Sequence, residues 1–137
     1  GDLADVWEQN KAREDLLKKG EQGDIKAMDE LGDNFFWGNN GFEQVSEIAL
    51  KWYEKARVGG SVNGMAGAGI LLIMGGAGDG QRDPSERPWT PREKIGFMYL
   101  SRAAERGSDL AIFILGDCFY YGLYGVPQDT PQAVHWL

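Results

Sequence analysis

The chain has 137 residues, of which 42% are hydrophobic and 26% charged, as is typical of a soluble globular domain. Its net charge of −7 argues against nucleic acid as a partner, because phosphate binding needs a basic surface. The longest apolar run, residues 70–74, is too short for membrane insertion, and the one cysteine cannot form an internal disulfide.

An amphipathic helix is expected first, over residues 3–19. Its apolar positions are Val6, Trp7, Ala12, Leu16 and Leu17. The segment 1–22 would serve as an N-terminal capping helix or as half of a preceding repeat, because stacked repeats need their end faces covered. The first residues carry neither a basic start nor an apolar stretch, so no targeting segment is indicated, and a soluble protein of the cytoplasm or the periplasm is expected.

Three copies of one pattern follow, over 23–59, 60–106 and 107–137. Each copy places small and large apolar residues at helical spacing between two glycines. The matching positions are Gly23, Ala27, Leu31, Gly32, Phe35 and Gly38 in the first copy; Gly60, Gly64, Ala68, Gly69, Leu72 and Gly75 in the second; and Gly107, Ala111, Leu115, Gly116, Phe119 and Gly122 in the third. This spacing predicts the first helix of a pair in every copy.

A second helix is predicted in each copy. Its repeated positions are Ala49, Trp52, Lys55 and Ala56, then Gly96, Tyr99, Arg102 and Ala103, and finally Ala133 and Trp136. The expected N-caps of these helices are Ser46, Thr90 and Thr130. Thr90 and Glu93 have the spacing of a capping box. The second copy also holds about ten extra residues between its helices, near 76–91, which predicts a longer loop there.

The third copy reads A-I-F-I-L-G-D-C-F-Y-Y-G-L-Y-G-V-P-Q-D-T-P-Q-A-V-H-W over 111–136 and resembles the Sel1-like repeat of the tetratricopeptide superfamily. The first copy departs in its loop, where Phe42 and Val45 replace Val126 and Asp129. The resemblance implies an all-α, right-handed superhelix (solenoid) of antiparallel helix pairs. It also implies a protein-binding role, as an adaptor, a scaffold or an immunity-type inhibitor of a partner protein, and a bacterial source.

In tetratricopeptide-like arrays the first helix of each pair lines a concave groove, so the resemblance implies a groove that binds a protein or peptide. Its residues would be Asp29, Asp33, Phe36, Trp37, Asn63, Ile73, Met74, Phe113, Asp117, Tyr120 and Tyr121, with Lys26, Ala66, Ile70 and Leu110 at further groove positions. Exposed aromatic residues usually mark an interaction surface, and the three aspartates would select the partner's orientation. Alternatively, some of these side chains pack against neighbouring repeats, Ile70 and Leu110 first.

The longer loop of the second copy offers another candidate contact. Arg82, Arg87 and Trp89 would meet the partner there, because insertions in repeat arrays often serve recognition. The alternative is a tolerated surface insertion with Trp89 folded back onto the array.

No catalytic residue, cofactor or metal site is expected. His135 is the only histidine, Cys118 fits a small buried thiol, and no metal-ligand spacing occurs. Gly64, Gly67 and Gly69 indicate either close backbone packing or a soft middle of the array. The alternative functions are a structural spacer within a longer repeat protein, a glycan binder and an enzyme, and the sequence does not indicate an oligomeric state.

Overall fold

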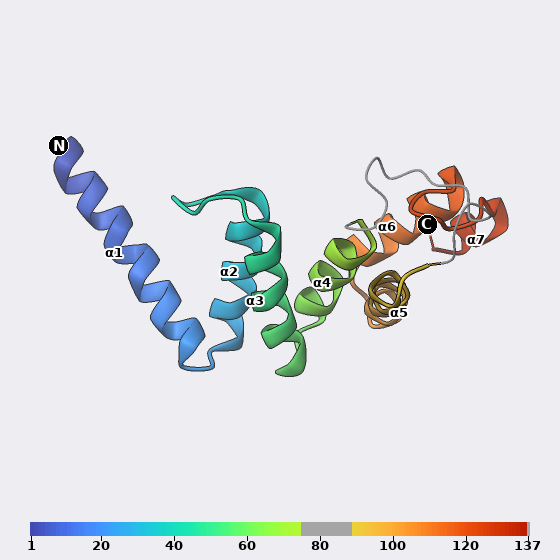
Figure 1. Ribbon diagram of the computed structural model, residues 1–137, viewed down its shortest axis with the longest axis horizontal. Coiled ribbons are helices and arrows are strands. Elements are labelled where there is room, and N and C mark those ends of the chain that lie inside the picture. Colours follow the sequence, from blue (N-terminus) through green and yellow to red (C-terminus); the bar gives the residue numbers. More distant parts are fainter. Residues whose placement is uncertain (75–88, 137) are drawn as a thin grey trace. The chain divides into compact units, whose positions relative to one another are not determined.

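The computed structural model describes residues 1–74 and 89–136, and within these residues it has seven helices and no strand (Figure 1). The helices are α1 Asp2–Glu21, α2 Ile25–Trp37, α3 Ser46–Val58, α4 Val62–Met74, α5 Pro91–Glu105, α6 Asp109–Tyr121 and α7 Thr130–Trp136. They form two compact units, Gly1–Gly67 and Ala68–Leu137, and α4 contributes residues to both. The prediction of an all-α fold is confirmed.

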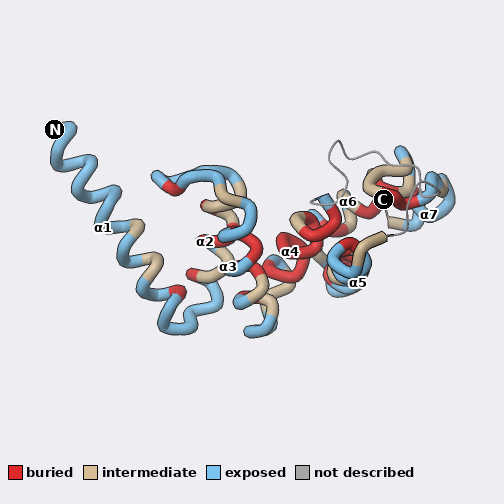
Figure 2. Tube along the Cα trace, viewed as in Figure 1, coloured by how far each residue is buried: buried red, intermediate tan, exposed pale blue. Residues whose placement is uncertain are grey.

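In the first unit, α2 and α3 form an antiparallel hairpin and α1 packs against α2. The core cluster consists of Leu31, Phe42 and Trp52, with Leu16, Leu17, Met28 and Phe35 packed against it. The predicted N-terminal helix is therefore present, but it is packed only through its C-terminal half. Leu3, Val6 and Trp7 are exposed, as the pale blue start of α1 in Figure 2 shows.

In the second unit, α6 packs against both α5 and α7, and Leu100, Leu115 and Val126 are fully buried. The C-terminal part of α4 crosses α5 at two glycines. A Cβ atom built on Gly96 would lie 2.8 Å from the backbone nitrogen of Ile73 and 2.9 Å from the carbonyl oxygen of Gly69. Only glycine therefore allows the two backbones to approach this closely.

The glycines at the start of α4 also face close neighbours. A Cβ on Gly64 would lie 2.7 Å from the carbonyl oxygen of Tyr53, and a Cβ on Gly67 would lie 2.7 Å from the ring of the same tyrosine. Of the two interpretations offered by the sequence, close packing thus accounts for these residues.

The loop after α2 and the loop after α6 share one set of hydrogen bonds. Gly38 and Gly122 end their helices with φ of 72° and 68°, a conformation that favours glycine. Each loop then returns a backbone N–H to its helix, from Val45 to Phe35 at 2.9 Å and from Asp129 to Phe119 at 2.7 Å. The side chains of Gln44 and Gln128 donate to the carbonyls of Phe36 and Tyr120 in the same way. The sequence differences between the two loops therefore leave the backbone pattern intact.

Two of the three predicted N-caps are wrong by one residue. Thr90 caps α5 with the predicted capping box to Glu93. At α3, however, the N-cap is Val45, and Ser46 is already helical. At α7, the Asp129 carboxylate accepts from the backbone N–H of Gln132, while Thr130 is the first helical residue. In both cases the residue whose backbone N–H closes the loop, Val45 or Asp129, directly precedes the first helical residue.

Candidate partner-binding site

The aromatic face of α2 consists of Asp29, Asp33, Phe36 and Trp37. The opposite side of α2 is buried through Ala27, Leu31 and Gly32, so these four residues point away from the core at helical spacing. Trp37 is 66% exposed, and its ring meets that of Phe36 edge to face, with centroids 4.8 Å apart. The helix ends directly afterwards, so the pair stands at its C-terminal tip.

The aromatic face of α6 consists of Phe113, Asp117, Tyr120 and Tyr121, the equivalent positions of the third copy. Tyr121 is 60% exposed, and the rings of Tyr120 and Tyr121 lie edge to face with centroids 4.7 Å apart. Phe113 is exposed as well. Both units thus present the same perpendicular aromatic pair at the end of the same helix.

Tyr53 of α3 connects the aromatic face of α2 to the interior of the first unit. Its ring lies between Gly32 and Gly67, where an added Cβ would come within 2.5 Å and 2.7 Å of ring atoms. Its hydroxyl donates to Asp33 Oδ1 at 2.5 Å. Burial, and next the hydrogen bond to Asp33, raise the pKa of Tyr53 well above its usual range, so the hydroxyl remains a donor. Sequence reasoning missed this residue, although small residues on two neighbouring helices are a signal for a large ring between them.

Asp29 joins α2 to the start of α4. The Ser61 hydroxyl donates to the Asp29 carboxylate at 2.7 Å and accepts from the backbone N–H of Gly64 at 2.9 Å. Burial raises the pKa of Asp29, the hydrogen bonds from Ser61 and Asn63 oppose that rise, and the charge of Asp33 adds to it. Asp29, Asp33 and Asn63 therefore have structural contacts besides any contact with a partner.

The other predicted groove residues divide between surface and core. Met74 and Leu110 are exposed, so Leu110 does not pack into the array as the alternative supposed. Ile70 is buried, as that alternative did suppose, and Ala66 is buried too. The assignment of Ile73 to the groove is wrong, because this side chain is fully buried where α4 crosses α5.

The candidate loop contacts are only partly described. Arg82 and Arg87 lie outside the described residues. Trp89 is half-buried and its ring packs on Phe97, with centroids 5.1 Å apart. Trp89 thus folds back onto its own unit.

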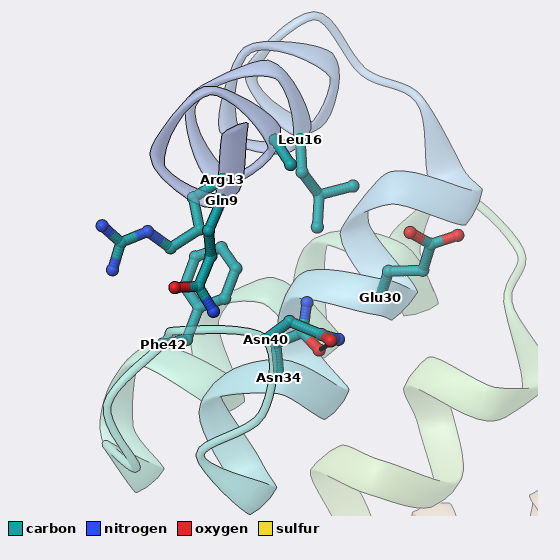
Figure 3. A pocket seen from close by; sticks show the side chains of 8 residues that line it. Gln9, Arg13, Leu16, Glu30, Asn34, Asn40 and Phe42 are labelled. Carbon is teal, nitrogen blue, oxygen red and sulfur yellow. Dashed lines mark hydrogen bonds between the residues drawn. The ribbon is translucent and has the colours of Figure 1, made fainter. Parts of the chain in front are cut away.

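A pocket of about 310 Å³ in the first unit was not anticipated from the sequence. Residues of α1, α2 and the loop after α2 line it (Figure 3). They include Gln9, Arg13 and Leu16 of α1, Glu30 and Asn34 of α2, and Asn40 and Phe42 of the loop. Arg13 donates to the Gly41 carbonyl and to Asn10. No local pattern in the sequence brings these three segments together, which is why the pocket was missed.

The Cys118 thiol is poorly suited to act as a nucleophile. The Cys118 thiol is buried, and burial followed by the charge of Asp117 raises its pKa to about 12. It is therefore protonated near neutral pH and a weak nucleophile. Within residues 1–74 and 89–136, no three histidine, cysteine or acidic side chains are grouped as metal ligands. None of the helices in that part of the chain is long and apolar enough to cross a membrane.

The structure and the sequence both resemble known proteins. Among solved structures, c5321, a protective antigen present in uropathogenic Escherichia coli strains that displays an SLR fold, has a TM-score of 0.65 and 25% identity to this chain. The match covers 88% of this chain and 23% of c5321. A Sel1 repeat protein from Oxalobacter formigenes has a TM-score of 0.63 and 24% identity, over 88% of this chain and 82% of that one.

The sequence comparisons agree with this likeness. Among curated proteins no sequence matches significantly. The model of the Sel1 repeat, however, matches residues 25–57, 89–108 and 109–137, which together span more than half of the chain. These matched segments include α2 and α3 of the first unit and α5, α6 and α7 of the second. The chain therefore belongs to the Sel1 repeat family.

Proposed function

We propose that this protein is a non-catalytic interaction module with two aromatic faces, one on α2 and one on α6, each of which binds a protein segment. Sel1 repeat proteins generally serve as protein-interaction scaffolds. The observation that carries the proposal is the recurrence of one edge-to-face aromatic pair, Phe36–Trp37 and Tyr120–Tyr121, whose last ring is exposed in both units. An immunity-type inhibitor of a partner protein is one form that this role can take.

The exposure of these rings has no structural benefit within either unit. Each buried apolar side chain stabilises a fold by roughly 1.5–3 kcal/mol, and an exposed ring forgoes most of that. Tryptophan and tyrosine are also the residues that most often contribute 2 kcal/mol or more to a protein interface. A role as a structural spacer does not explain why Trp37 and Tyr121 are both exposed at the same repeat position.

Affinity capture with a designed pair of variants tests the proposal. The test variant is Trp37→Ala/Tyr121→Ala, which truncates one exposed ring in each unit. The control variant is Val58→Ala/Val134→Ala, which truncates two exposed apolar side chains on the second helices. We expect all three proteins to melt alike, and we expect the parent and the control to retain a partner that the test variant loses.

The same experiment separates the alternatives. Equal capture by all three proteins contradicts binding on the aromatic faces. Saturable binding of an oligosaccharide that is lost in the test variant supports the glycan alternative, because sugars also stack on exposed aromatic rings. Turnover of a substrate that survives in the test variant supports an enzyme.

A further inference from the structure

We infer that a segment bound on either face is basic, and that each face receives an arginine or lysine side chain between its aspartate and its aromatic pair. This inference rests on the proposed function and names the chemistry of the partner. The occupant is a protein segment with cationic side chains, not an acidic or a neutral one.

The first observation is the spacing of acid and rings. Asp33 precedes Phe36 and Trp37 by three and four residues, and Asp117 precedes Tyr120 and Tyr121 in the same way. Residues at these spacings share one face of a helix. Both aspartates are partly exposed, on the same helix face as the rings. Each unit therefore repeats a carboxylate next to an edge-to-face aromatic pair.

The second observation is the distribution of charge over the helices. The first helices of the repeats, α2, α4 and α6, carry five acidic residues and one basic residue. These are Asp29, Glu30, Asp33, Asp109 and Asp117, with Lys26. By contrast, α3 and α5 each carry three basic residues against two acidic ones, and α1 carries four basic residues against six acidic ones.

The single lysine lies away from Asp33 and the aromatic pair of α2. Lys26 precedes Asp33 by seven residues, which corresponds to about 10 Å along a helix. This exceeds the screening length of about 8 Å at physiological salt. On α6 no basic residue occurs at all. On their own helices, Asp33 and Asp117 therefore have no basic residue within the screening length.

A guanidinium or ammonium group can interact both with the aromatic rings and with the carboxylate of each face. The face of an aromatic ring attracts a cation, and a carboxylate accepts hydrogen bonds from it. Asp33 already accepts from the Tyr53 hydroxyl through Oδ1, and a carboxylate has capacity for further donors. The rings also bury the apolar stem of arginine or lysine. An acidic segment would instead be repelled by the aspartates and by the net charge of −7.

Selection from a displayed library of random peptides tests the inference. The parent protein is the bait, and each selected peptide is then measured by fluorescence polarisation at two salt concentrations. We expect the peptides to be enriched in arginine and lysine and their affinity to fall at higher salt. Replacing those residues by glutamine in the peptide is expected to weaken binding about tenfold.

Variants of the protein test the same inference from the side of the aspartates. Asp33→Asn/Asp117→Asn removes the two charges and keeps an oxygen that can accept from Tyr53. Asp117→Asn alone serves if the double variant melts early. Asp5→Asn/Asp15→Asn removes two exposed charges of α1 as the control. We expect about tenfold weaker peptide binding for the test variants and little change for the control.

Each other outcome has a distinct meaning. Peptides without basic residues that still lose binding on Trp37→Ala/Tyr121→Ala overturn this inference and leave the proposed function standing. Basic peptides that bind the parent and Asp33→Asn/Asp117→Asn equally also overturn the inference. If no peptide depends on Trp37 or Tyr121, the proposed function fails and the inference fails with it.

Discussion

At Gly96, replacing a helical glycine by alanine is expected to destabilise the protein, which is the reverse of the usual effect. Glycine inside a helix costs about 0.5–1 kcal/mol relative to alanine, so Gly96→Ala would normally stabilise the protein. Here the added methyl group would meet backbone atoms of Ile73 and Gly69 that cannot rotate away. We therefore expect Gly96→Ala to lower the free energy of unfolding by about 1–3 kcal/mol, as other overpacked sites do.

Thermal and urea unfolding, followed by circular dichroism, measure this change. Ile95→Ala, at an exposed neighbouring position of α5, is the control and is expected to change the free energy of unfolding by less than about 1 kcal/mol. A Gly96→Ala protein as stable as the parent would show that α4 and α5 do not cross as closely as described.

The hydroxyl of Tyr53 has a separate role from its ring. Tyr53→Phe keeps the ring between Gly32 and Gly67 but removes the donor to Asp33. A partly buried carboxylate that loses such a donor costs about 1–2 kcal/mol. We expect this loss in urea unfolding of Tyr53→Phe and almost none in Tyr120→Phe, where the hydroxyl is on the surface. Equal stabilities of the two variants would contradict a structural role of the Asp33 contact.

At the scale of the element, the start of α4 is linked to α2 through the titratable carboxyl group of Asp29. Ser61 caps α4 and donates to Asp29, whose pKa is raised by burial. A raised pKa means that the folded state holds this proton more tightly than the unfolded chain. The contribution of Asp29 to the free energy of unfolding therefore rises as the pH falls through its folded pKa, above the ordinary value of 3.8.

Asp29→Asn removes this titration while preserving an acceptor for Ser61. We expect the variant to gain most stability over the parent at neutral pH, where Asp29 of the parent is charged. This difference in the free energy of unfolding should shrink as the pH approaches 3.8. Urea unfolding over that pH range measures the difference. A difference that is constant or that grows on acidification would contradict the raised pKa of Asp29.

The helix pairs could be read from the sequence because their signals are local. Glycines at helix ends and apolar residues at helical spacing depend on neighbours within one copy. The assignment of Ile73 failed because it was carried over from the family's repeat pattern by position. In the second copy, Gly69 and Gly96 let α5 approach α4, and this approach covers Ile73.

The parts of the site that the sequence did not predict are those built from distant segments. The Asp33–Tyr53 contact joins two helices, and the pocket beside Phe42 joins α1 to the loop after α2. Neither has a fixed spacing that a reader of one sequence can recognise. The exposed rings of Trp37 and Tyr121, by contrast, follow directly from their repeat positions, and their exposure agrees with that expectation.

At the scale of the whole molecule, each unit has its own buried centre and its own aromatic face. Leu31 and Leu115 hold the same repeat position, and both are fully buried. In repeat proteins the stability is approximately a sum over units and their neighbours, so a defect in one unit loosens that unit first. A matched pair of substitutions can therefore show how far the two units unfold separately.

Leu31→Ala and Leu115→Ala remove the same atoms from the two centres, and each is expected to cost about 2–5 kcal/mol. Hydrogen exchange followed by mass spectrometry then reports where the protein opens. We expect Leu31→Ala to accelerate exchange mainly in α1, α2 and α3, and Leu115→Ala to do so mainly in α5, α6 and α7. Because α4 contributes residues to both units, its exchange should rise in both variants. Uniform acceleration across all seven helices in either variant would instead mean that the described units unfold as one, and that binding on one aromatic face can be coupled to the stability of the other unit.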